Sequence, residues 1–194
     1  MDIAPRLIEN AIAASPEYGE KIEFLAADVT DNELLTRLES KKFEAISCGT
    51  AIMDMVDIEP LAESVARLLK PGGRFVFTVV HPAFNSPKGL SRPVEGIEME
   101  DGRIVDTLAV KFSHYINPTS YEGVTVVSQP VLQRYIHRPM SVLLNVFFTR
   151  GFVADGIEEP VFGSSTPSHV LDWDNFQEIS RVLAVRLPTL DTGK

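Results

Sequence analysis

The sequence predicts an α/β fold in which a mostly parallel sheet carries helices on both faces, with an inserted hairpin and lid. First, short apolar runs alternate with segments whose apolar residues recur at helical spacing, as in parallel strands buried between helices. Second, this alternation breaks over residues 85–130 and resumes afterwards. A chain of 194 residues, 44% of them hydrophobic, can bury one substantial core. We therefore expect a single domain over residues 1–194.

Two helices and a short strand are predicted near the N-terminus. Pro5 suits a first helical turn, and the apolar residues after it predict a helix that ends by Ser15. Residues 22–27 have the length and character of a short buried strand. Thr30-Asp31-Asn32-Glu33 has the form of a capping box, so the second helix is expected to start there.

A strand, a helix and another strand follow. Residues 43–48 predict a strand, and the spacing of the leucines and valine over 61–69 predicts a helix. Pro71-Gly72-Gly73 is expected to stop that helix, because proline and glycine are typical of the residues beyond a helix end. The next strand is expected over residues 74–80.

Regular structure is interrupted and then returns. Asp101-Gly102 lies between two apolar stretches and predicts the tight turn of a hairpin. Pro139 is expected to open a core helix that Gly151 closes. Strands over residues 152–157 and 181–187 complete the predicted fold.

Composition argues against several classes of function. A net charge of −9 and a sequence pI of about 4.9 oppose binding to nucleic acid or anionic membranes, because both need clustered cations. Cys48 is the only cysteine, and no secretion signal or apolar run of about 18 residues is present. We therefore expect a soluble cytoplasmic protein. The four histidines and Cys48 show no metal-ligand spacing, so no metal is expected.

Four segments carry a resemblance to a known family: Phe43-Glu44-Ala45-Ile46 leading to Thr50-Ala51-Ile52-Met53-Asp54, Leu68-Leu69-Lys70-Pro71-Gly72-Gly73-Arg74-Phe75, His81-Pro82-Ala83-Phe84-Asn85, and Arg150-Gly151-Phe152-Val153 with Glu158-Glu159-Pro160. Their order resembles class I S-adenosylmethionine-dependent methyltransferases of the small-molecule type, from Asp2 to about Leu187. The resemblance implies an incomplete Rossmann-like methyltransferase fold. The family's first strand and glycine-rich turn have no counterpart in the sequence.

The resemblance also implies where S-adenosylmethionine would bind. Asp2 matches the acidic residue whose carboxylate accepts hydrogen bonds from the ribose hydroxyls, and Asp28 matches the position beside the adenine. The implied cofactor-binding residues are Asp2, Ile3, Asp28, Val29, Gly49 and Thr50. A carboxylate at the carboxyl end of a parallel strand faces the ligand crevice of such sheets. An alternative is that Asp28 only precedes a helix N-terminus, where carboxylates are favourable.

Candidate catalytic residues lie in and beside the insertion. An imidazole can deprotonate an attacking hydroxyl or amine near neutral pH, which makes His81 the first candidate base and His137 the second. The competing interpretation is that His81 caps a loop and His137 only precedes a helix. Aromatic and histidine side chains predicted to contact an acceptor are Phe84, His114, Tyr115, Tyr121 and Tyr135.

The missing glycine-rich turn leaves two hypotheses about function. In the first, the chain is part of a methyltransferase that modifies a small, aromatic or secondary-metabolite acceptor. In the second, a natural short form has lost the cofactor and acts as a cofactor-free cyclase or isomerase, or as a binding partner. Without the family's central strand, two sheet edges are expected to be exposed. A homodimer that covers these edges is the expected partner arrangement.

Overall fold

The computed structural model describes residues 1–19, 21–84, 91–123, 131–161 and 178–190. Its main sheet has four strands in the order β1 (Phe43–Gly49), β2 (Leu69–Val80), β8 (Val182–Pro188) and β7 (Gly156–Glu158). β1 and β2 are parallel, whereas β8 is antiparallel to both β2 and β7. Three strands therefore share one direction, but only the β1–β2 pairing is parallel, so the sheet is mixed where the sequence predicted a mostly parallel one.

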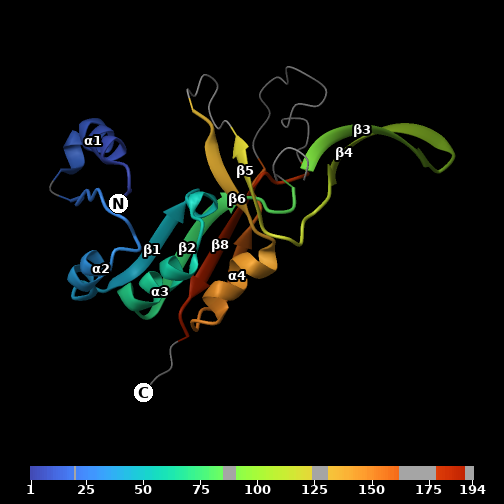
Figure 1. Cartoon of the computed structure of the whole chain (residues 1–194). Helices are drawn as coiled ribbons and strands as arrows, with labels where there is room; N and C mark the ends of the chain where they lie inside the picture. Colours follow the sequence, from blue (N-terminus) through green and yellow to red (C-terminus); the bar gives the residue numbers. More distant parts are fainter. Residues whose placement is uncertain (20, 85–90, 124–130, 162–177, 191–194) are drawn as a thin grey trace.

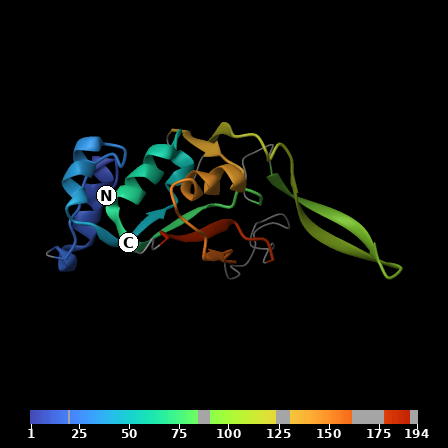
Figure 2. The same ribbon diagram turned by 90° about the horizontal axis from the view of Figure 1, so that it is seen from below.

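Two helices cover one face of this sheet. α3 (Glu59–Leu68) and α4 (Met140–Phe148) lie side by side against β2 and β8 (Figures 1 and 2). Phe75 and Phe77 of β2 and Phe147 of α4 stack within 5.7 Å of one another and are at most 1% exposed. Alternate residues of β2 and β8 on the opposite face are only partly buried or exposed. In the described part of the chain, the helices that pack on this sheet therefore lie on one face, where the sequence predicted both.

The N-terminal region contains less strand than predicted. α1 (Pro5–Ala14) forms as expected, but residues 22–27 contribute only one parallel bridge, between Asp2 and Ala26. The backbone N–H of Asp2 donates to Leu25, and that of Ala27 donates to Asp2. No strand within the described ranges pairs with the outer edge of β1. A strand needs a neighbouring strand to pair its backbone N–H and C=O groups. Residues 22–27 pair only with Asp2, so they do not form a strand.

The second helix begins one residue later than a capping box at Thr30 implies. α2 (Asn32–Glu39) is capped by Asp31, whose Oδ1 accepts from the N–H of Glu33 at 2.9 Å and of Leu34 at 3.5 Å. The leucines of α2 pack against Leu68 at the end of α3 in a small second core. The predicted apolar stripe of this helix is confirmed.

β2 starts earlier than the sequence suggested. α3 ends at Leu68, and the strand runs on from Leu69 through the proline and glycines, with a register irregularity against β1. A Cβ on Gly73 would lie 2.8 Å from the carbonyl oxygen of Lys70, so only glycine fits here. The Pro-Gly-Gly signature therefore forms a bulged strand start and not a loop.

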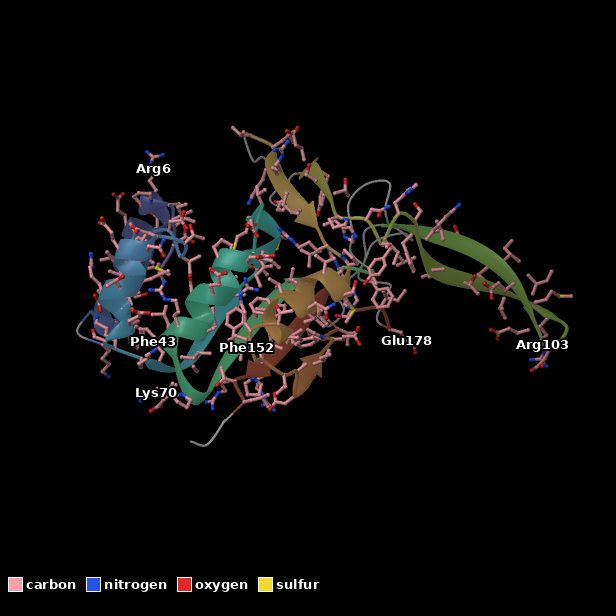
Figure 3. All side chains as sticks on the ribbon, turned by 60° about the horizontal axis from the view of Figure 1, so that its bottom comes forward. Arg6, Phe43, Lys70, Arg103, Phe152 and Glu178 are labelled. Carbon is pink, nitrogen blue, oxygen red and sulfur yellow. The ribbon has the colours of Figure 1, made fainter. Side chains whose placement is uncertain are left out.

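The insertion contains two antiparallel strand pairs. β3 (Ser91–Glu100) and β4 (Arg103–Phe112) form a long arm that projects from the body, with Arg103 near its tip (Figures 1 and 3). Asp101 and Gly102 both have positive φ, 48° and 78°, as the predicted tight turn requires. The second pair, β5 (Thr119–Gly123) with β6 (Gln133–His137), was not predicted. Residues 85–90 and 124–130 of the expected lid lie outside the described residues.

The last elements differ from prediction mainly in their limits. Residues 152–157 were expected to form one strand, but Phe152 makes only an isolated bridge to Thr189 and β7 begins at Gly156. α4 begins after Pro139 as predicted, and Gly151 has φ 84° beyond its end. No helix within the described ranges is long and apolar enough to cross a membrane.

Candidate active site

A pocket lies at the carboxyl end of β2, where η2 (Ile52–Asp54), β5, β6 and α4 meet. The space between its lining atoms, with the open solvent at its mouth counted in, is about 360 Å³. Its lining is largely apolar, with three polar side chains, and comprises Ile52, Met53, Val79, Val80, Pro82, Tyr121, Ile136, His137, Arg138 and Leu143. Such a recess, apolar with a few placed polar groups, suits a small organic ligand.

His81 lies directly after β2 and is only 2% exposed. Its Nδ1 accepts from the backbone N–H groups of Ala83, at 3.2 Å, and Phe84, at 3.3 Å. Its Nε2 lies 2.8 Å from Oε1 of Glu159, so the hydrogen on Nε2 is donated to that carboxylate. Burial lowers the pKa of His81 and outweighs the opposing effect of Glu159. Both ring nitrogens of the neutral imidazole are therefore occupied.

His137, at the end of β6, lines the pocket itself. Its Nε2 lies 2.8 Å from the carbonyl oxygen of Tyr115 and must be the donor, because a carbonyl only accepts. In the neutral ring, Nδ1 is then the basic nitrogen. The hydroxyl of Tyr115 also accepts from the N–H of Met140 at 2.9 Å, which ties the residue to the start of α4. Tyr115 thus holds His137 and α4 together.

Two tyrosines face each other across the β5–β6 pair. Tyr121 and Tyr135 are directly opposite in register, with ring centroids 5.4 Å apart, and Tyr121 lines the pocket. Burial raises the pKa of Tyr121 to about 12, with smaller contributions from Tyr135 and the charge of Asp54. Burial likewise raises the pKa of Asp54, and a hydrogen bond with the Gln133 side chain has a smaller, lowering effect on that pKa. Asp54 ends η2, which packs against β6.

The remaining predicted acceptor contacts are dispersed. Phe84 stacks on the imidazole of His81 at 4.4 Å and so supports that ring. His114 is exposed, with φ 54°, in the link between β4 and β5. The structure therefore places Tyr121 and His137 in the lining of one recess, whereas Tyr135 packs on Tyr121 without lining it and His114 lies outside it.

Arg138 is a site residue that the sequence analysis missed. It is 8% exposed, lines the pocket and donates to the carbonyl oxygens of Ile52, Met55 and Val56. Burial lowers the pKa of this guanidinium, against a raising effect of Asp57. These bonds fasten the loop after β1 to β6. The sequence did offer a signal for Arg138, because a charged residue next to Pro139, at the start of a predicted core helix, is unusual enough to suggest a specific role.

The predicted cofactor residues on the β1 side lie at the carboxyl ends of their segments. Gly49 ends β1, and no atom lies within 4 Å of the place its Cβ would occupy. Thr50 follows with φ 48°, and its N–H donates to the backbone carbonyl of Thr78 at 3.0 Å. Val29 packs at the margin of the main core, and its carbonyl accepts from the hydroxyl of Ser64 at 3.0 Å. The open space beside Gly49 is suited to a ligand lying against the backbone.

The two carboxylates are each half engaged. Oδ1 of Asp28 accepts from the N–H and hydroxyl of Thr30, both at 2.8 Å. Oδ1 of Asp2 accepts from the N–H of Ala4 at 2.8 Å, while Ile3 is 70% exposed. In both cases the second carboxylate oxygen has no partner among the described residues, so it can accept from a ligand. Both features fit the adenosine part of S-adenosylmethionine, whereas no glycine-rich turn in the sequence matches its methionine part.

The described residues contain no group of three or more His, Cys, Asp or Glu side chains placed to hold a metal ion. His169, one of the four histidines, lies outside them.

Comparison with known proteins gives matches to methyltransferases. Residues 1–77 match the family described as "Methyltransferase domain". A solved S-adenosylmethionine-dependent methyltransferase from Mesorhizobium loti is 22% identical, with a TM-score of 0.63, over 96% of this chain and 78% of that one. One from Clostridium acetobutylicum is 11% identical, with a TM-score of 0.53, over 97% and 73%. The CcbJ methyltransferase from Streptomyces caelestis is 14% identical, with a TM-score of 0.55, over 94% and 69%. No curated protein matches.

The chain therefore has the fold of class I S-adenosylmethionine-dependent methyltransferases. More particularly, its first 77 residues carry the sequence of a methyltransferase domain. The match over residues 1–77 includes the two motifs between Phe43 and Phe75, and the solved structures share the fold that the resemblance implied. Asn85, the last residue of the third motif, lies outside the described residues.

Proposed function

We propose that this protein transfers a methyl group from S-adenosylmethionine to a small-molecule acceptor of secondary-metabolite type. The observation that supports this most directly is the position of the loop after β1. Gly49 and Thr50 are the residues expected to contact the cofactor, and Ile52 and Met53, two and three residues beyond Thr50, line the pocket. One short loop thus borders both the expected donor and the acceptor recess. Methyl transfer depends on such proximity, because the nucleophile must lie in line with the sulfonium methyl.

Asp2, Asp28 and Val29 are the residues that would hold the adenosine part. The unengaged carboxylate oxygens would accept hydrogen bonds from hydroxyl or amino groups of the nucleoside. When bound, S-adenosylmethionine supplies an electrophilic methyl group on a sulfonium sulfur. The chain's own residues then have to orient the acceptor, exclude water and remove one proton.

His137 is the base in this proposal. Its ring lines the pocket, and its Nε2–H donates to the carbonyl oxygen of Tyr115, which orients the imidazole. His81 is assigned a positioning role, since its ring fixes the turn that carries Pro82 into the pocket wall. The order of the two histidines is therefore reversed relative to the sequence analysis.

Calorimetric titration with S-adenosylmethionine and S-adenosylhomocysteine tests the cofactor step. We expect micromolar binding, and a loss of about tenfold in Asp28→Asn, corresponding to one charge-assisted hydrogen bond. Asp106→Asn, on the projecting arm, is the matched control and should bind as the parent does. A folded chain that binds neither ligand would sink the methyltransferase proposal and direct attention to cofactor-free cyclisation or isomerisation in the same pocket.

Turnover assays with small amines and phenols test the base. His137→Gln should lower kcat by about 100-fold or more, the usual contribution of general-base catalysis, and leave S-adenosylmethionine affinity unchanged. His114→Gln is the control, because that imidazole is exposed and outside the pocket. Equal kcat in the two variants would remove His137 from this role.

We also propose that a second copy of the chain is the protein's partner. The outer edge of β1 is unpaired within the described ranges. The N-terminal region also exposes five apolar side chains, at Met1, Ile3, Leu7, Ile12 and Ile22. Unpaired edges and apolar surface are both features that association covers.

A further inference from the structure

One part of the pocket lining, at Pro82, belongs to a turn over residues 82–84 that follows β2 and is called the Pro82 wall below. The N–H of His81 donates to the carbonyl oxygen of Arg181 at 2.9 Å, so the backbone of His81 is still held by the residues that lead into β8. Proline has no N–H, so the first donors of the turn are those of Ala83 and Phe84. Both donate to Nδ1 of His81, whose ring therefore ties the turn to the end of the strand.

Glu159 holds the opposite side of the same ring. Its Oε1 lies 2.8 Å from Nε2 of His81, and the imidazole is 2% exposed whereas the Glu159 side chain is 51% exposed. The next residue, Pro160, has its carbonyl oxygen 2.8 Å from the hydroxyl of Ser180, which is buried. The carboxylate therefore extends from a segment that is fixed to the residues before β8. Without this acceptor the buried Nε2–H would be left unsatisfied, which is costly.

The two hydrogen bonds at Nδ1 require a neutral imidazole. In the tautomer that Glu159 accepts from, Nε2 carries the hydrogen and Nδ1 offers the lone pair to both backbone N–H groups. A proton taken up from solvent occupies that lone pair and places an N–H against two further N–H donors. The bond from Nε2 to Glu159 can persist. Protonation of His81 therefore breaks the contacts on the side of the turn.

Burial and a carboxylate act in opposite directions on the protonation of His81. Burial disfavours the imidazolium and has the larger effect, so the pKa of His81 is lowered although Glu159 raises it. Arg181 is the charged residue just before β8, and its backbone carbonyl meets the N–H of His81. The turn contributes the apolar ring of Phe84, stacked at 4.4 Å. The bonds at Nδ1 are therefore complete above the ordinary histidine pKa and are lost as pH falls through the lowered one.

These contacts make the pocket depend on two residues that do not line it. We propose that Glu159 and His81 are positioning residues for the Pro82 wall, and that the wall is released when His81 takes up a proton. The consequence for catalysis rests on the proposed methyl transfer, because acid would then weaken acceptor binding by a route separate from His137. The positioning of the wall does not rest on it.

Hydrogen exchange of the Ala83 and Phe84 amides at pH 7.5, followed by NMR, tests the positioning. Glu159→Leu should speed the exchange of both amides by about tenfold or more, because the ring loses the acceptor that holds it. Glu159→Gln keeps an oxygen that accepts from Nε2–H, so its amides should exchange as in wild type. Glu158→Leu, at the exposed neighbouring position, is the matched control. Wild-type protection in Glu159→Leu would overturn the role of Glu159.

An NMR titration from pH 8 to 5.5 tests the release. The amide signals of Ala83 and Phe84 should move together with the imidazole signals of His81, with one midpoint below the ordinary histidine pKa of about 6.5. The methyl signal of Met53, which lines the same pocket, should follow them. Glu159→Gln should lower the midpoint, because the carboxylate no longer favours the imidazolium.

The opposite results are equally definite. No titration of His81 above pH 5.5, or titration without movement of the two amides, would overturn the release. A constant Met53 signal while the amides move would mean that the turn loosens without changing the pocket, and would overturn the role of the Pro82 wall. S-adenosylmethionine is present in none of these measurements. Failure of cofactor binding would therefore leave the wall standing, and failure of the wall would leave methyl transfer standing.

Discussion

At the scale of single residues, the two histidines show how environment separates similar side chains. The sequence placed His81 first because it directly follows a strand end. The structure engages both nitrogens of His81 outside the pocket lining, whereas His137 lines the pocket and donates from Nε2 to Tyr115. No local sequence signal distinguishes them, because the partners Glu159 and Tyr115 are distant along the chain.

The lowered pKa of His81 predicts a pH dependence of stability. The unfolded imidazole binds a proton at a higher pH than the folded one, so the stabilising contribution is complete above the unfolded pKa of about 6.5. It is lost as pH falls from there toward the lowered folded pKa. Urea unfolding of wild type and His81→Gln between pH 8 and 5 should show a steeper loss in wild type. His114→Gln should follow wild type, and parallel curves for wild type and His81→Gln would contradict this account.

At the scale of elements, Arg138 connects β6 to the loop after β1. Arg138→Met should lower the free energy of unfolding by about 2–4 kcal/mol, because charge-assisted bonds to three carbonyls are lost and those acceptors remain partly buried. Denaturant unfolding measures this. Arg134→Met, at an exposed position of the same strand, should change the free energy by no more than about 0.5 kcal/mol.

Helix α4 provides a test of which face packs on the sheet. Phe147 is fully buried against Phe75, Phe77 and Phe152, while its neighbour Phe148 is 39% exposed. Phe147→Ala should cost about 3–5 kcal/mol of unfolding free energy, because it leaves a cavity in the core. Phe148→Ala should cost clearly less. Similar losses in the two variants would mean that α4 is rotated relative to the structure described above.

Some elements could be predicted from sequence patterns only a few residues long. The Asp101-Gly102 turn and the start of α4 after Pro139 were predicted because each depends on backbone preferences within a few residues. The β5–β6 pair was not predicted, since its register joins Tyr121 to Tyr135 across residues that carry no two-residue turn signal.

At the scale of the whole molecule, the arm and the N-terminal region lie at opposite ends of the body, as the positions of Arg103 and Arg6 show (Figure 3). The four-stranded sheet between them carries the core, and the pocket lies at the carboxyl end of β2. The proposed partner contact at β1 and α1 is therefore distinct from the arm.

Multi-angle light scattering tests the proposed homodimer. The expected mass is about twice the chain's 21.5 kDa, and Leu7→Glu combined with Ile12→Glu should return it to the mass of one chain. Ile97→Glu, at an exposed position on the arm, should leave the dimer intact. A wild-type mass of one chain at micromolar concentration would contradict the proposal.

By itself, the sequence determined the α/β class, most helix and strand positions, the arm's turn and the resemblance to methyltransferases. These depend on periodicity, turn residues and motif order, which operate over short distances along the chain. Tertiary structure alone decided that the main sheet is covered on one face in the described region and that His137 lines the pocket. It also decided that Arg138 is a site residue, since its bond to Ile52 spans 86 positions. Such contacts depend on burial and strand register, which no local pattern encodes.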